Sequence, residues 1–175
     1  MIKKKVLDAI NKQINAEMYS AYLYLSMSAY FEDTNLSGCA NWMKVQAQEE
    51  MTHAMKLYNS LLDRGGRINL DAIKAPPKAW KSPLHVFQEA YKHELMVTGL
   101  INKLVKLAKD EGDYATEGML QWFVDEQVEE EANASEIVNK LKLAKGAGSA
   151  LFMIDKELSA RIFVDETVTP KQGGK

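Results

Sequence analysis

Residues 47–61 read AQEEMTHAMKLYNSL, a stretch that places two metal-binding residue types inside an apolar helical stripe. Glu50 and His53 stand three positions apart, so a helix presents them on neighbouring parts of one face. At roughly 100° per residue, the same face carries Leu57 and Leu61. Burying a carboxylate there is costly unless a cation accompanies it. This Glu-x-x-His step is weak evidence alone, and its weight depends on the other helices.

Acids also stand at the centres of apolar stripes on three other predicted helices. They are Glu17, Glu94 and the pair Glu126 and Glu130. Any one of them could be partly exposed, but several at matching depths indicate carboxylates that face one another around a cation. One Glu from each of two helices, with clustered ligands on the others, is the ligand layout of a di-iron carboxylate bundle. An oxygen-rich set with one nitrogen suits iron or manganese better than a structural zinc.

The composition is typical of one globular domain, which we place over residues 1–175. Apolar residues make up 46% and charged residues 26% of the chain. The net charge of −2 gives no field that favours nucleic acid, so we expect no nucleic-acid partner. The single cysteine, Cys39, excludes an internal disulfide and a cysteine-based zinc site, and it favours a cytoplasmic location. No apolar run approaches the roughly 18 residues that span a bilayer, so we expect no membrane partner.

The helical pattern is broken by turn residues at four places, which predicts four long helices and a short fifth one. Their approximate ranges are residues 5–33, 37–64, 83–110 and 114–145 for a bundle over residues 5–145, then residues 149–163. Ser82 and Pro83 are expected as the N-cap and first position of the third helix. The tail, residues 167–175, is expected to be mobile.

Connection lengths set the topology. Short turns make the first and second helices antiparallel neighbours, and likewise the third and fourth, whereas residues 65–82 can cross the full length of a bundle. The fold class is therefore all-α, a ferritin-like four-helix bundle with one long crossover plus a short fifth C-terminal helix. That helix has an apolar side, which must meet the bundle end or other subunits, and we expect it to serve assembly. The apolar side consists of Leu151, Ile154, Leu158 and Ile162.

Two further side chains are expected to face the same space. Tyr24 lies seven residues from Glu17 and is either a core tyrosine or a hydrogen-bond or redox partner of the site. Gln127 is neutral and lies on the inner stripe of its helix, which predicts an asymmetric site. His85 and His93 have no partner on the right phase, and we interpret both as ordinary.

Over nearly its whole length the chain resembles the non-haem ferritins of bacteria and archaea. The matching stretches are residues 15–17 with Tyr24, residues 48–54, the turn at residues 65–67, residues 93–94 and residues 120–131. The resemblance implies a first iron held by Glu17, Glu50 and His53 and a second held by Glu50, Glu94 and Glu130, with Gln127 beside them. It also implies a third iron site formed by Glu49, Glu126 and Glu129 together with Glu130.

The resemblance further implies a homo-oligomeric shell of twenty-four subunits, with the fifth helix near the four-fold axes. In this chain, Leu120 stands where ferritins of animal type have the second acid of a three-fold pore, and Glu117 matches the first. Met51 stands where bacterioferritins have a haem-binding methionine, but Glu130 stands where they have a site histidine. We therefore expect iron as the cofactor and no haem.

The leading hypothesis is iron storage and detoxification by a ferroxidase. Fe²⁺ is oxidised at the intra-subunit di-iron centre with O₂ or H₂O₂ as oxidant, and ferric mineral is deposited inside the hollow shell. A soluble di-iron oxygenase or peroxidase is the main alternative, but it usually has two Glu-x-x-His steps or an added Cys-x-x-Cys module. A DNA-protecting mini-ferritin lacks a fifth helix, and a purely structural bundle leaves the buried acids unexplained.

Overall fold

The computed structural model describes residues 2–165 and 167, and helices account for most of them. The helices are α1 (Lys4–Asp33), α2 (Ser37–Asp63), α3 (Pro83–Asp110), α4 (Tyr114–Ala144) and α5 (Gly148–Leu158). No strand occurs in this described part of the chain. The predicted all-α class is confirmed.

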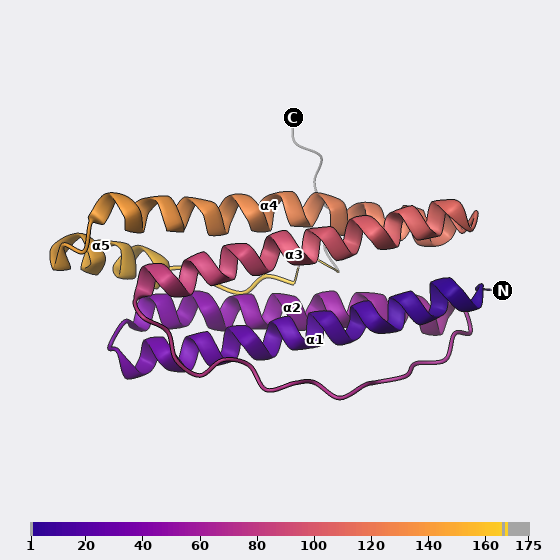
Figure 1. The fold of residues 1–175 in the computed structure, drawn as a ribbon, viewed down its shortest axis with the longest axis horizontal. Helices are drawn as coiled ribbons and strands as arrows, with labels where there is room; N and C mark the ends of the chain where they lie inside the picture. The colour runs from indigo at the N-terminus through magenta and orange to yellow at the C-terminus, as the bar shows by residue number, and fades with distance from the viewer. Residues whose placement is uncertain (1, 166, 168–175) are drawn as a thin grey trace.

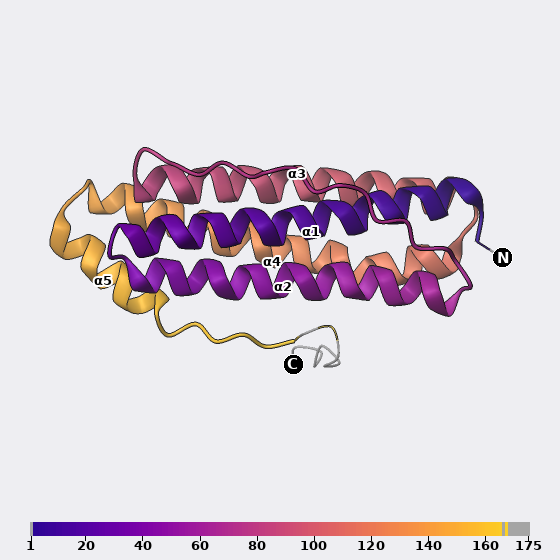
Figure 2. The same cartoon turned by 90° about the horizontal axis from the view of Figure 1, so that it is seen from below.

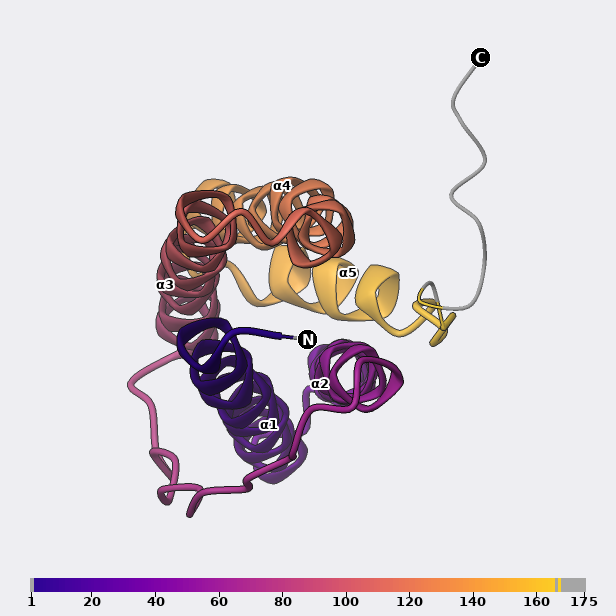
Figure 3. The same cartoon turned by 90° about the vertical axis from the view of Figure 1, so that its right-hand side faces the viewer.

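The four long helices lie side by side along the long axis of the molecule, and α5 packs across one end (Figure 1). α1 and α2 form one antiparallel pair, and α3 and α4 form the other (Figures 1 and 2). Seen along the bundle, α3 lies next to α1, so the two pairs join through these helices (Figure 3). The predicted four-helix bundle with one long crossover is confirmed, because the chain between α2 and α3 returns along the outside of α1.

The ends of the helices are set by local hydrogen bonds. Ser82 is the N-cap of α3, as predicted, because its hydroxyl accepts from the backbone N–H of His85 at 3.1 Å and Pro83 follows it. Asp113 caps α4 in the same way by accepting from the N–H of Thr116 at 3.2 Å. The guanidinium of Arg64, at the end of α2, makes two 2.9 Å hydrogen bonds to the Asp113 carboxylate. This pair joins the end of α2 to the start of α4.

The long crossover is held against α1 by polar side chains of that helix. Asn11 donates to the carbonyl of Arg67 at 3.1 Å and accepts from the N–H of Asn69 at 2.8 Å. Further along, the Ser26 hydroxyl donates to the carbonyl of Pro77 at 2.6 Å. An irregular segment needs such partners for its backbone groups, so these bonds fix its course along α1.

Two apolar clusters fill the bundle, and a polar layer separates them. One cluster includes Phe31, Trp42 and Phe87, and the other includes Ile10 and Leu57. On each long helix, the acidic positions singled out from the sequence fall between residues of the first cluster and residues of the second. The carboxylates therefore lie at one level in the middle of the bundle. Leu120 is fully buried in the second cluster, so the side chain at this position belongs to the core of the subunit.

α5 is more closely integrated with the bundle than the sequence predicted. Ile154 and Leu158 are buried in the first apolar cluster, so this part of the apolar side meets the bundle end, and the expectation that α5 serves assembly and is not part of the core is wrong for these two residues. The Asp155 carboxylate accepts from the N–H of Cys39 at 2.8 Å, which satisfies a free donor in the first turn of α2. A Cβ on Gly38 would lie 1.7 Å from the Asp155 carbonyl oxygen, so only glycine permits this approach.

α5 also ends earlier than predicted, at Leu158, and Ile162 lies beyond it with 76% of its surface exposed. The physical reason is Asn41 on α2, whose side-chain amide donates to the carbonyls of Ser159 and Arg161 at 3.4 and 2.9 Å. These bonds supply partners for carbonyl groups at the end of the helix and turn the chain along α2 (Figure 2). Apart from Thr167, the tail predicted to be mobile lies outside the described residues.

No helix in the described residues is both long enough and apolar enough to cross a membrane.

Candidate metal centre

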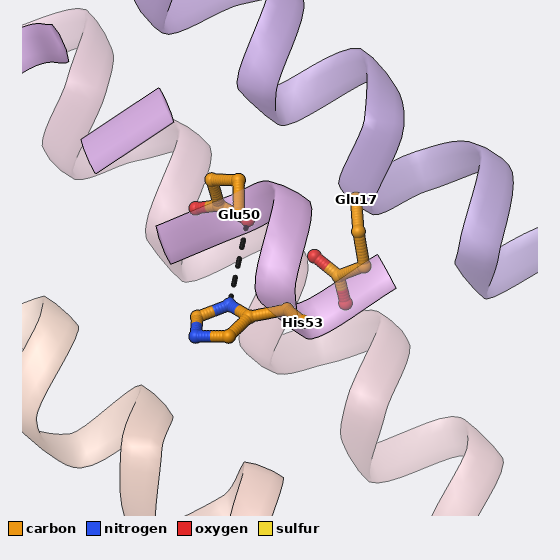
Figure 4. Close-up of side chains that lie close together, drawn as sticks. All are labelled: Glu17, Glu50 and His53. Carbon is orange, nitrogen blue, oxygen red and sulfur yellow. Dashed lines mark ion pairs between the residues drawn. The ribbon is translucent and has the colours of Figure 1, made fainter. Parts of the chain in front are cut away.

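Glu17, Glu50 and His53 form the centre of the polar layer. One ligand atom from each lies within 4.8 Å of the others, and the three residues are only 1%, 1% and 4% exposed. Figure 4 shows the Glu17 side chain of α1 reaching towards the turn of α2 that carries Glu50 and His53. The Nδ1 atom of His53 lies 3.6 Å from Oε2 of Glu50. Two carboxylates and an imidazole at this separation can hold one metal ion.

A second group contains His53 again, now with two acids of α4. One ligand atom each of His53, Glu126 and Glu130 lies within 4.8 Å of the others, and all three side chains are buried. Glu126 therefore lies at the inner layer, beside His53. The turn of α4 that carries Glu126 and Glu130 faces inward, as the helical periodicity of its apolar residues predicted.

Glu94 of α3 belongs to the same layer and is 0% exposed. The Tyr24 hydroxyl donates a short hydrogen bond to Oε1 of this carboxylate. The Gln127 amide donates to Oε2 at 3.3 Å, and also to Thr98 at 3.2 Å. Of the two interpretations of Tyr24, the structure favours the hydrogen-bond partner of the site.

Burial changes the proton affinity of all four central carboxylates. Loss of solvation raises the pKa of Glu17 and of Glu94 from the usual 4.5 to about 7. Burial raises the pKa of Glu50 well above its usual range, and the charges of Glu94, Glu17 and Glu130 raise it further. The pKa of Glu130 is raised by burial first and by Glu94 second. Without a metal, the centre therefore reduces its charge by holding protons.

Several uncharged side chains that support these acids were not predicted from the sequence. Gln13 donates to Oε1 of Glu17 at 2.8 Å, and Gln46 donates to Oε2 of Glu130 at 2.5 Å. Each glutamine stands four residues before a central glutamate of its own helix, so helical spacing in the sequence could have indicated both.

His93 shares a 2.7 Å hydrogen bond with Ser20, and burial lowers its pKa to about 4, so it stays neutral at physiological pH.

Of the acids expected at a third site, Glu49 and Glu129 lie outside the buried layer. Glu49 is partly buried, and its Oε2 lies 2.5 Å from Nη2 of Arg161, in the segment after α5. Glu129 is exposed on α4. Glu126, the third expected member, is 7% exposed and faces inward. The three acids thus run from the interior to the surface.

The centre fits a bound metal ion better than it fits a purely structural core. One oxygen of Glu17 and one of Glu50 are buried without a hydrogen-bond partner among the described residues. A buried oxygen without a hydrogen bond costs free energy in a metal-free protein. A cation bound at these oxygens would remove that cost. A helical bundle with carboxylates and one imidazole facing inward is typical of metalloproteins that bind metal through carboxylates in the bundle core.

The comparisons with known proteins agree with this class. Residues 7–144 match the family model described as a ferritin-like domain. The bacterial non-heme ferritin of Bacteroides fragilis is 49% identical over 161 residues, which cover 92% of this chain and 100% of that protein. A structure of Archaeoglobus fulgidus ferritin engineered into a closed form has a TM-score of 0.93 and 52% identity, covering 94% of this chain and 100% of that one. The open pore ferritin of the same archaeon has a TM-score of 0.92 and 52% identity, with 93% and 100% coverage.

The chain therefore belongs to the ferritin family. Membership supports iron storage, and the buried glutamate and histidine cluster is compatible with a ferroxidase centre. The expected resemblance to bacterial and archaeal non-haem ferritins is confirmed.

Proposed function

We propose that the protein oxidises Fe²⁺ at a di-iron ferroxidase centre inside each subunit and stores the ferric product. Glu17, Glu50 and His53 bind one Fe²⁺, while Glu50, Glu94 and Glu130 bind the second. Glu50 would serve both ions, because it lies with Glu17 and His53 and the charges of Glu94 and Glu130 also act on it. The observation that carries the proposal is the close approach of buried Glu17, Glu50 and His53 ligand atoms, within 4.8 Å.

The protonated state of the centre supports this assignment. Carboxylates with pKa values near 7 release protons readily when a cation arrives, so metal binding replaces protons without opening the bundle. The buried oxygens of Glu17 and Glu50 that accept no hydrogen bond then bind the cation. Hard carboxylate oxygens with one imidazole suit both Fe²⁺ and Fe³⁺.

Tyr24 and Gln127 position Glu94 at the second iron. Burial raises the pKa of the Tyr24 hydroxyl well above 10, so it remains a donor to the Glu94 carboxylate. Gln127 donates to the other oxygen of Glu94, so hydrogen bonds fix the orientation of that carboxylate.

In the proposed reaction, the two Fe²⁺ ions lose one electron each. Dioxygen takes two electrons and two protons to give hydrogen peroxide, or peroxide takes two electrons and two protons to give two waters.

A third iron site would use Glu49, Glu126 and Glu129 and share Glu130 with the centre. The gradient of these acids from the buried layer to the surface supports a route by which ferric iron leaves the centre. Hard oxygen ligands suit the small trivalent ion.

The protein would assemble into a homo-oligomeric shell of twenty-four subunits in the cytoplasm, with the mineral inside. The similarity to ferritins of known structure over more than nine tenths of the chain supports this assembly. With a subunit of 19.7 kDa, such a shell has a mass of about 470 kDa, which size-exclusion chromatography with light scattering would detect. A monomer or dimer would instead favour a soluble oxygenase.

Crystals soaked in Fe²⁺ test the centre directly. Anomalous scattering should show two metal ions inside each subunit, on the order of 3–4 Å apart, as in other two-metal sites. One should contact Glu17 and His53, and the other should contact Glu94 and Glu130. Metal found only at the boundaries between subunits would contradict the proposal.

A further inference from the structure

Arg161 lies beside the metal centre although it comes from the irregular segment that follows α5. Its Nη2 atom donates to Oε2 of Glu49 at 2.5 Å, and its Nη1 atom donates to Oε1 of Gln46 at 2.7 Å. The Arg161 and Glu49 side chains are only 21% and 18% exposed. A pair so far removed from solvent is screened less than a surface ion pair, so a second cation near Glu49 must compete with the guanidinium.

Gln46 extends this contact into the centre. The fully buried Gln46 accepts from Arg161 through its carbonyl oxygen and donates to Glu130 at 2.5 Å through its nitrogen. Because a guanidinium has donors only, it fixes which end of the amide faces outward and which end faces Glu130. The positive charge of Arg161 is therefore linked to Glu130 through one buried amide.

The position of Arg161 is determined by further contacts rather than by Glu49 alone. Its guanidinium carbon lies 4.6 Å from the centre of the Trp42 ring, a cation–π contact. Its backbone carbonyl accepts from Asn41 at 2.9 Å, and its N–H donates to the carbonyl of Leu158 at 3.3 Å. Arg161 is thus held in place from the ring side and from the backbone side.

We propose that Arg161 is a resident cation of the outer carboxylate site, which holds Glu49 and orients Gln46 until an incoming metal ion displaces it from Glu49. The inference rests on the proposed ferroxidase function, because it concerns the third site of that centre. Arg161 is a positioning residue: it acts on Glu130 through Gln46 and on the outer metal by competition for Glu49.

Two consequences follow for metal binding. The outer site binds a metal more weakly than the ligands alone would allow, because the Arg161 pair has to break first. Its filling also removes the side-chain bond between Arg161 and Glu49, which weakens the attachment of the segment that carries Arg161. An outer site that binds weakly lets ferric iron pass on instead of retaining it.

The test measures Zn²⁺, a redox-silent surrogate for Fe²⁺, by titration calorimetry on the intact metal-free assembly. Wild type should bind two Zn²⁺ per subunit tightly and a third more weakly. In Arg161→Gln the third binding constant should rise by roughly tenfold, since the competing charge is gone. Arg161→Lys should give an intermediate value, because a single ammonium cannot reproduce the fork that reaches Gln46 and Glu49.

Lys140→Gln is the matched control. It removes one positive charge from the same side of the subunit, where Lys140 pairs with Glu136 and Glu157. A general change in surface potential would strengthen the third site equally in Lys140→Gln and Arg161→Gln. Such an equal effect would overturn the inference.

Hydrogen exchange gives an independent measurement in the wild type. The N–H groups of Ser159, Ala160 and Arg161 donate to carbonyls of α5, at 3.1, 3.2 and 3.3 Å. Their exchange should speed up when the third Zn²⁺ binds, and not when the first two do. Unchanged exchange together with an unchanged third affinity in Arg161→Gln would contradict the displacement.

The two proposals fail in different ways. If two Zn²⁺ bind tightly but Arg161→Gln has no effect on the third, the ferroxidase centre stands and the role of Arg161 is wrong. If the two tight sites are missing while Arg161→Gln still strengthens an outer one, the di-iron centre is wrong and Arg161 keeps its role. If Arg161→Gln binds no third Zn²⁺ at all, the role of Arg161 is wrong whatever the inner sites do.

Discussion

Glu49 and Glu50 are neighbours in the sequence, yet the bundle places them in two different electrostatic environments. Glu50 is 1% exposed, and burial raises its pKa well above the usual range. Glu49 keeps 18% of its side chain exposed and pairs with Arg161. Burial thus favours the protonated form of the inner carboxylate, whereas the outer one lies against a cation.

The difference follows from depth. Deep burial makes a charged carboxylate so costly that protonation is the cheaper state, whereas near the surface an ion pair retains enough solvation to persist. A proton leaves the inner site without moving the chain. A guanidinium must carry its side chain with it, so we expect the two regions to respond to metal by different physical routes.

Removing the bridging carboxylate should have the largest effect. Glu50→Ala takes a ligand from both proposed irons, and we expect the initial rate of Fe²⁺ oxidation to fall by about 100-fold or more. Stopped-flow absorbance of the ferric product measures this rate. Glu136→Ala, which removes an exposed acid on α4, is the control and should keep the wild-type rate. Wild-type oxidation by Glu50→Ala would place the chemistry elsewhere.

Neutralising Glu94 should stabilise the metal-free protein. Its pKa is about 7 in the folded state against 4.5, so the folded state binds more protons between these pH values, and stability falls as pH rises through this window. The loss is on the order of 3 kcal/mol for this one group at 1.36 kcal/mol per unit. Glu94→Gln removes the charge that causes this loss of stability, so the melting temperature at pH 8 should rise by several degrees.

Calorimetry at pH 5 and pH 8, with a chelator present, measures this effect. Glu89→Gln on the same helix is the control, because this half-exposed acid lies 3.9 Å from Lys92 at the surface. Added Zn²⁺ should remove most of the pH dependence of the wild type. A lower melting temperature for Glu94→Gln at pH 8 would mean that burial of this charge costs little.

The outer acids should affect later steps more than the first one. In Glu49→Ala with Glu129→Ala, the rapid oxidation of the first two irons should change by less than about twofold, because their ligands remain. Regeneration of the centre between additions should slow several-fold, and the ratio of iron oxidised to oxygen consumed should change. Oxygen-electrode measurements over repeated additions test this. An unchanged ratio and turnover would reduce Glu129 and Glu49 to a solvated acidic face.

The smallest expected effect comes from Tyr24→Phe. It removes one hydrogen bond to Glu94, which is worth about 1 kcal/mol, so binding of the second metal should weaken roughly fivefold. Zn²⁺ titration measures the affinity. Tyr22→Phe, an exposed tyrosine of the same helix, should bind as wild type. Equal affinities in the two variants would make Tyr24 a packing residue only.

The buried carboxylate layer was predictable because the helical periodicity of the sequence shows which side chains face the inside of the bundle. An acid on an apolar stripe, repeated on four helices, predicts which side chains meet, and the turns predict which helices are neighbours. Glu17, Glu50 and His53 lie together for that reason. Gln13 lies on the same face as Glu17, four residues before it, so helical periodicity also explains its contact with that acid.

The outer region was not predictable in this way. Arg161 lies outside any helix, and its contact with Glu49 spans 112 positions of the chain. No periodicity connects the two residues. Its place depends on where α5 ends, and that depends on Asn41, whose amide binds carbonyls that sequence patterns do not reveal.

Gly38 has a consequence that extends beyond its own turn. Its missing side chain lets the backbone of α5 approach that of α2, and Arg161 follows the last residue of α5 by three positions. Only Ser159 and Ala160 separate the end of α5 from Arg161. A neighbouring chain that shifts α5 at the end of the bundle would therefore change the separation of Arg161 and Glu49. We therefore expect one glycine to link the geometry of assembly to the charge balance at Glu49.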